Sequence, residues 1–132
     1  MIKTKLVVMG ALWLATALAY GAEKGVHFVE PSDGATLNGE FKVVMGVRGM
    51  QVAPAGAVAE NSGHHHLLID AEPIPAGEVV PKSEQHMHFG KGQTETTLKL
   101  PPGKHTLTLQ FADGSHRSYG EAMRSTITVT VQ

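Results

Sequence analysis

The chain has 132 residues, of which 42% are hydrophobic and 17% charged, which suits one compact domain and argues against wholesale disorder. Cysteine is absent, so disulfides, thiolate metal sites and a cysteine nucleophile are excluded. Eleven basic and twelve acidic residues give a net charge of −1, and no basic run offers a surface for nucleic acid.

The N-terminus has the pattern of a secretory signal peptide. A basic start precedes an apolar run over residues 6–19 that closes with an Ala-x-Ala sequence. The run is shorter than the roughly 20 apolar residues that a transmembrane helix needs. We therefore expect a signal peptide over residues 1–19, with cleavage after Ala22 as the alternative. The mature chain, residues 20–132, is then a single domain in the periplasm or outside the cell.

Seven short segments alternate apolar and polar residues and are separated by Gly, Pro, Asn or Asp. No segment after the leader has a convincing helical period. Seven strands with turn signals at this spacing are typical of an immunoglobulin-like antiparallel β-sandwich. The predicted strands cover residues 26–30, 41–48, 64–70, 84–89, 94–100, 105–112 and 125–131. The predicted core is Val26, Phe28, Phe41, Val43, Met45, Val47, Leu67, Ile69, Leu98, Leu100, Leu107, Leu109, Phe111, Ile127, Val129 and Val131.

The third predicted strand carries three consecutive histidines, His64, His65 and His66. Alternate residues of a strand share a face and lie about 6.5–7 Å apart along the chain. Leu67 and Ile69 form the apolar pair of this strand, so His65 shares the core face with them. His64 and His66 therefore turn to the other face, which we expect to meet solvent.

The fourth predicted strand carries a second His-x-His pair. Met87 and Phe89 are its apolar residues. His86 and His88 therefore turn outward. If the third and fourth strands are neighbours, facing residues have Cβ atoms about 4.5–5.5 Å apart, and four imidazoles converge on one patch. In some sandwiches the fourth strand crosses to the opposite sheet, which would separate the two pairs, and the sequence leaves this open.

Four imidazoles on one patch indicate a transition-metal site. Neutral imidazole is a good ligand for Zn²⁺ and Cu²⁺, and the hypothesis is a metal-binding module with copper placed slightly ahead of zinc. Acid should weaken binding below a pH of about 6.5, where imidazole takes up a proton. A polar strand face that binds no metal is the alternative interpretation of each pair. The predicted ligands are His64, His66, His86 and His88.

Four further residues are weaker candidates for this site or its surroundings. Met50 offers a thioether of the kind that Cu⁺ prefers, although filling a gap in the core is the alternative role. Asp70 could orient a histidine through a hydrogen bond or simply cap the end of its strand. His116 follows a turn-forming Asp-Gly-Ser sequence, and we expect it to be exposed. His105 shares its parity with apolar residues and is expected at the end of the core.

Several segments of the mature chain form long and specific motifs. They are GMQVAPAG (residues 49–56), GHHHLLID (63–70), HMHFGKGQTET (86–96) and LPPGKHTL (100–107), with looser matches at DGSH (113–116) and AMR (122–124). Together they resemble the domain of unknown function 4399 family of small exported bacterial proteins, over nearly all of the mature chain. The resemblance implies a secreted single-domain β protein whose signature includes both histidine clusters. It implies no activity.

Enzymatic activity is not expected from this sequence. A Gly-x-Ser-x-Gly elbow is absent, and a copper histidine brace would need histidine as the mature first residue, where cleavage leaves Tyr20 or Glu23. Three histidines with an open fourth position could still form a hydrolytic or redox site. The alternative to metal binding is a metal-free immunoglobulin-like module that docks a periplasmic protein through an edge strand or the loop over residues 49–63. Neither interpretation involves nucleic acid or, once the leader is removed, a membrane.

Overall fold

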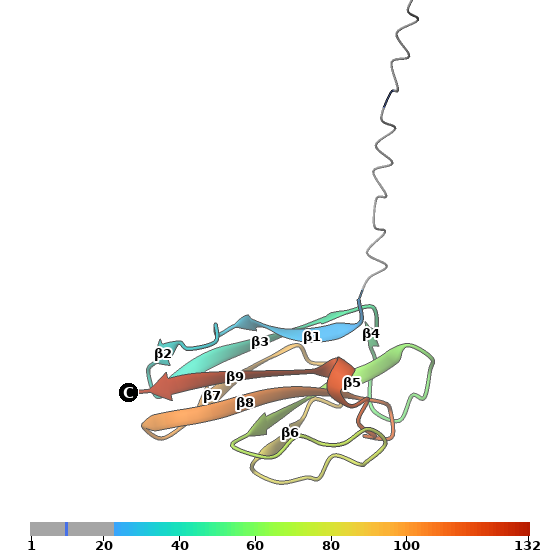
Figure 1. Ribbon diagram of the computed structural model, residues 1–132. Helices are drawn as coiled ribbons and strands as arrows, with labels where there is room; N and C mark the ends of the chain where they lie inside the picture. The colour runs from blue at the N-terminus through green and yellow to red at the C-terminus, as the bar shows by residue number, and fades with distance from the viewer. Residues whose placement is uncertain (1–9, 11–22) are drawn as a thin grey trace, which may run out of the picture.

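Two β-sheets make up the fold of the part of the chain that the computed structural model describes, Gly10 and residues 23–132 (Figure 1). The predicted signal peptide and both cleavage sites lie, apart from Gly10, outside the described residues. Within the described part, no helix is long and apolar enough to span a membrane. This described part is all-β, and its two sheets are consistent with the predicted β-sandwich.

The smaller sheet has the strand order β1-β3-β7, and the larger has the order β2-β9-β8-β5-β4, with β6 paired to β5. All seven predicted strands are present, and each of their ends lies within two residues of the prediction. The prediction missed β2 and β4, which have two residues each. The elements are β1 (Gly25–Glu30), β2 (Thr36–Leu37), β3 (Glu40–Arg48), β4 (Gln51–Val52), β5 (Ser62–Ile69), β6 (His86–His88), β7 (Glu95–Lys99), β8 (Gly103–Ala112), the 3₁₀ turn η1 (Glu121–Met123) and β9 (Arg124–Val131).

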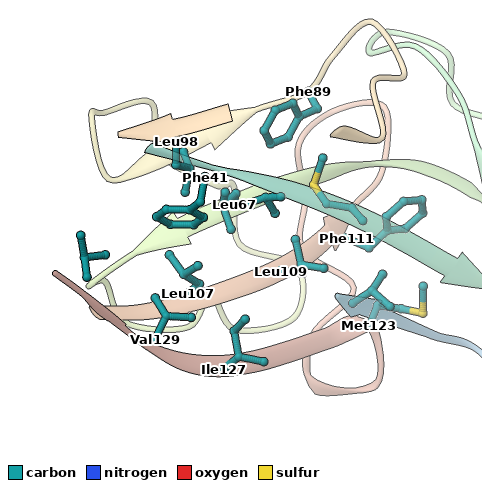
Figure 2. Close-up of a cluster of buried hydrophobic side chains, with 14 residues drawn as sticks. Phe41, Leu67, Phe89, Leu98, Leu107, Leu109, Phe111, Met123, Ile127 and Val129 are labelled. Carbon is teal, nitrogen blue, oxygen red and sulfur yellow. The ribbon is translucent and has the colours of Figure 1, made fainter. Parts of the chain in front are cut away.

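The main core lies between the two sheets because apolar and polar residues alternate along the strands. In β3, for example, Phe41, Val43 and Met45 are buried, whereas Lys42 forms an exposed ion pair with Glu95 of β7 (3.1 Å). Figure 2 shows the side chains of this core, drawn from both sheets. Every residue predicted for the core lies in it or packs against it, and Phe89 and Met123 complete it.

A second, smaller core lies on the outer face of the larger sheet. The segment over residues 70–85 folds back beside β6 (Figure 1) and packs Ile74 and Val80 against Leu68 of β5. The N–H of Val80 donates a hydrogen bond to the carbonyl of His116 (2.9 Å), which ties this segment to the turn after β8. The face of β5 opposite the main core is therefore covered by protein.

Candidate metal centre

Strand β5 places His64 and His66 side by side on the outer face of the larger sheet. Antiparallel pairing sets them beside Ala112 and Gln110 of β8, and the prediction that they face away from Leu67 is confirmed. The expectation that they meet solvent is wrong, because both side chains are fully buried. The segment after β5 and the turn after β8 fold back on this side of the sheet, and the alternation within one strand carries no information about such folding.

His65 points into the main core, as its parity with Leu67 predicts. Its ring meets the ring of Phe111 edge to face, with centroids 5.1 Å apart. Both ring nitrogens of His65 are buried and have no hydrogen-bond partner among the described residues. Burial, together with the nearby His64 and His27 rings, lowers the pKa of His65 to about 4, so this imidazole is neutral at pH 7.

Strand β6 lies next to β5, which resolves the strand order that the sequence left open. The antiparallel register pairs His66 with His88 and Leu68 with His86. Only one residue of the second His-x-His pair therefore faces a histidine of the first. His86 instead forms a hydrogen bond between its Nδ1 and the Ser83 hydroxyl (2.6 Å), and it takes no part in the ring contacts described next.

The turn after β8 supplies a fourth histidine, His116. The Asp113 carboxylate accepts hydrogen bonds from the N–H groups of Ser115 (2.8 Å) and Arg117 (3.0 Å), which fixes the turn. His116 adopts a left-handed backbone conformation with φ of 62°, in which histidine is tolerated better than most residues. The prediction that His116 is exposed is wrong: the residue is half-buried, and its ring reaches His64 and His66.

Four rings thus meet at one point, and we call His64, His66, His88 and His116 the histidine cluster. The Nδ1 atom of His116 lies 3.0 Å from Nε2 of His64, 3.3 Å from Nε2 of His66 and 3.2 Å from Nδ1 of His88. His64, His66 and His116 each offer a ring nitrogen within 4.8 Å of the other two, the spacing of residues that could hold a metal ion. Three of these four residues, His64, His66 and His88, are ligands predicted from the sequence, and His116 is one of the weaker candidates.

One hydrogen bond fixes the orientation of a lone pair in the cluster, that of His88. Nε2 of His88 donates to the Pro81 carbonyl (2.7 Å), which leaves the lone pair of a neutral ring on Nδ1, the atom that faces His116. Nδ1 of His64 is buried without a hydrogen-bond partner among the described residues. If the inward Nε2 of His64 carries the lone pair, the N–H of the neutral ring lies on this buried Nδ1 and is unpaired.

Burial also lowers the pKa of His64, His66 and His116, three of the four imidazoles of the cluster. Burial, reinforced by the His116 and His88 rings, lowers the pKa of His64 to about 4. Burial and the neighbouring imidazoles lower the pKa of His66 to about 2, against a small opposing effect of the Gln110 backbone. Burial and His88 also lower the pKa of His116. The acid limit of these imidazoles therefore lies below the value of about 6.5 that the sequence analysis assumed.

These shifts predict that the metal-free protein loses stability in mild acid. The folded pKa values of His64, His65 and His66 lie below the unfolded value of 6.5, so the unfolded chain binds more protons as the pH falls below 6.5. We expect the free energy of unfolding to drop by a few kcal/mol, on the order of 1.4 kcal/mol per pKa unit and group, between pH 7 and pH 5. Urea denaturation at the two pH values tests this, and equal midpoints would contradict it.

The other candidates lie away from the cluster. Asp70 accepts hydrogen bonds from Nδ1 of His105 (2.7 Å) and from the Thr106 N–H (2.8 Å). It thus orients a histidine, as the sequence analysis considered, but one outside the cluster. The hydrogen bond that Asp70 accepts raises the pKa of His105, which lies partly buried near the start of β8. Met50 is partly buried and packs against the main core.

Comparisons with known proteins identify a family and a fold but no activity. The family model described as "Domain of unknown function (DUF4399)" matches residues 43–132, which include the whole histidine cluster, and confirms the resemblance seen in the sequence. No curated protein matches the chain. Among solved structures, the endo-beta-1,4-mannanase from Thermotoga petrophila is similar, with a TM-score of 0.50 and 15% identity over 83% of this chain. The chain spans 20% of the length of that enzyme, and at this identity the likeness concerns the fold alone.

Proposed function

Because the chain belongs to the family described as Domain of unknown function (DUF4399), which carries no assigned activity, we propose a function from the site itself: the domain binds one transition-metal ion, copper or zinc, through the histidine cluster. Neutral imidazole is a preferred ligand of both metals. The nitrogens of His64, His66 and His116 lie close enough together to share one ion. The proposal adds His88 as a fourth donor, because its Nδ1 lies 3.2 Å from Nδ1 of His116; His116 takes the place that the sequence prediction gave to His86.

One observation carries this proposal: three ring nitrogens crowd Nδ1 of His116. An imidazole nitrogen offers either one N–H or one lone pair in the plane of its ring, so it makes one good hydrogen bond. The three nitrogens at 3.0–3.3 Å therefore leave at least two pairs that hydrogen bonds do not satisfy. A cation between the nitrogens of His64, His66 and His116 would attract their lone pairs at once, which removes this conflict.

The β framework supports the site because it holds two of the ligands on one rigid strand. We propose that this framework is immunoglobulin-like. Its sheet order β1-β3-β7 corresponds to strands A, B and E of that fold, and β9-β8-β5 corresponds to G, F and C. With the signal peptide that the sequence predicts, the domain would bind its metal in the periplasm or outside the cell.

Titration of the mature, untagged protein with Cu²⁺, Cu⁺ and Zn²⁺ tests the proposed function. We expect one tightly bound equivalent. His88→Asn should weaken binding by at least about 100-fold, because loss of an outer hydrogen bond to a ligand already costs 10–100-fold. Weak, non-stoichiometric binding would contradict the proposal and would favour a metal-free interaction module that docks a periplasmic protein.

A further inference from the structure

The turn after β8 reaches the histidine cluster through His116, and a carboxylate closes that turn. Oδ1 of Asp113 accepts hydrogen bonds from the N–H groups of Ser115 (2.8 Å) and Arg117 (3.0 Å). The main chain of Asp113 adds two more, because its carbonyl accepts from the His116 N–H (2.9 Å) and its N–H donates to the Arg117 carbonyl (2.9 Å). These hydrogen bonds set the conformation of the backbone that carries the His116 ring.

His116 holds a backbone conformation that is unfavourable for most residues. Its φ of 62° lies in the left-handed region, where the Cβ atom crowds the following carbonyl oxygen. In this conformation Nδ1 of His116 lies 3.0 Å from Nε2 of His64 and 3.3 Å from Nε2 of His66. A relaxed turn would carry the ring elsewhere, so the approach of His116 to β5 depends on the groups that hold the turn.

Neighbouring segments hold the turn from two sides. Gly114 lies directly against the Ala57 main chain, and a Cβ atom at position 114 would collide with the Ala57 carbonyl oxygen. On the other side, the Val80 N–H donates a hydrogen bond to the His116 carbonyl (2.9 Å). These contacts fix where the turn lies in the fold. Its internal conformation depends on the hydrogen bonds that Asp113 makes.

We infer that Asp113 is a positioning residue for the metal ion, an inference that rests on the proposed function. The hydrogen bonds of its carboxylate go to the backbone of the turn, so Asp113 acts through His116. The His116 ring is one of three whose nitrogens lie close enough to share one ion. A ring that is already in place binds the ion without the entropy loss of ordering the turn.

Asp113→Ala tests this role, and Asp113→Asn is the conservative variant. Alanine removes the acceptor of both side-chain hydrogen bonds. We expect it to weaken binding of Zn²⁺ and of Cu²⁺ in isothermal titration by about 10–100-fold, the usual cost of losing an outer partner of a metal ligand. Asparagine keeps an oxygen that accepts both hydrogen bonds, so its affinity should stay within a few fold of the wild type.

Asp33→Ala is the matched control. The Asp33 carboxylate accepts a hydrogen bond from the Thr128 N–H of β9 (2.8 Å) and takes no part in the turn after β8. This variant therefore loses the same charge and the same kind of hydrogen bond as Asp113→Ala. Its affinity for both ions should match that of the wild type.

A double-mutant cycle with His116→Asn distinguishes positioning from a general loss of stability. In that background the ring that Asp113 positions is absent, so Asp113→Ala should cost less than about 3-fold in further affinity. A general weakening of the domain would instead cost the same factor in both backgrounds. Such equal factors would contradict the inference.

The remaining outcomes separate this inference from the proposed function. An affinity of Asp113→Ala within a few fold of the wild type would overturn the role of Asp113 and leave a metal-binding protein. Equal losses in Asp113→Ala and Asp113→Asn would show that the charge matters and the hydrogen bonds do not, which also overturns positioning. Failure of the wild-type chain to bind either ion would overturn the proposed function itself.

Discussion

Replacing His116 by asparagine is expected to weaken metal binding by at least about 100-fold without unfolding the domain. Nδ1 of His116 lies 3.0–3.3 Å from a ring nitrogen of each of the other three histidines of the cluster. The substitution therefore removes the ligand atom that all three rings face. Asparagine tolerates the left-handed backbone conformation that residue 116 adopts, with φ of 62°, better than most residues. Isothermal titration with Zn²⁺ measures the change.

His86→Asn is the matched control for this variant. His86 belongs to the same His-x-His pair as His88, but it lies opposite Leu68 and hydrogen-bonds Ser83. Its replacement should leave the affinity for Zn²⁺ within a few fold of the wild type. Equal losses in the two variants would show that the histidines bind metal as a diffuse surface, and unchanged affinity in His116→Asn would remove this residue from the site.

The second large effect concerns the stability of the main core, on the other face of the sheet that carries the histidine cluster. Phe111→Ala is expected to lower the free energy of unfolding by about 3–5 kcal/mol, the usual cost of emptying a buried phenylalanine position. Phe111 is fully buried, packs edge to face on His65 and stacks on Tyr119 with ring centroids 6.3 Å apart. Urea denaturation of the metal-free protein at pH 7 measures the loss.

Val58→Ala serves as the control for the core substitution, because Val58 is 75% exposed. Its effect should stay within about 0.5 kcal/mol, as for most surface substitutions. A loss below about 1 kcal/mol in Phe111→Ala would mean that Phe111 does not fill the core as described.

Bound metal should raise the unfolding midpoint of the wild type, since an ion that binds only the folded state stabilises it.

The strands and the main core could be predicted because both follow from local alternation. Successive side chains of a strand point to opposite faces, so apolar residues at every second position of β3, β8 and β9 identify the buried face of each strand. The two-residue strands β2 and β4 escaped prediction because two residues are too few to show a period. β2 pairs with β9 and β4 pairs with β5, so each of these short strands is formed by hydrogen bonding to a longer strand from another part of the chain.

The candidate site was predicted only in part, for a reason of register. Parity placed His64 and His66 on one face and His65 on the other, and the structure agrees. Parity does not say which residues of two strands lie opposite. In the antiparallel register of β5 and β6, His88 lies opposite His66, whereas His86 lies opposite Leu68 and outside the cluster. The fourth ring comes from residue 116, in a turn 50 residues beyond His66.

The sequence by itself therefore determined the strands, the faces of their side chains, the family and the types of residue available to bind a metal. Each of these depends on neighbours along the chain or on long motifs. The tertiary structure alone decided that His116 joins the cluster, that His86 does not, and that His64 and His66 are fully buried. These outcomes depend on which residues of paired strands lie opposite each other and on how the segments after β5 and β8 fold back, and alternation within a single strand gives no information about either.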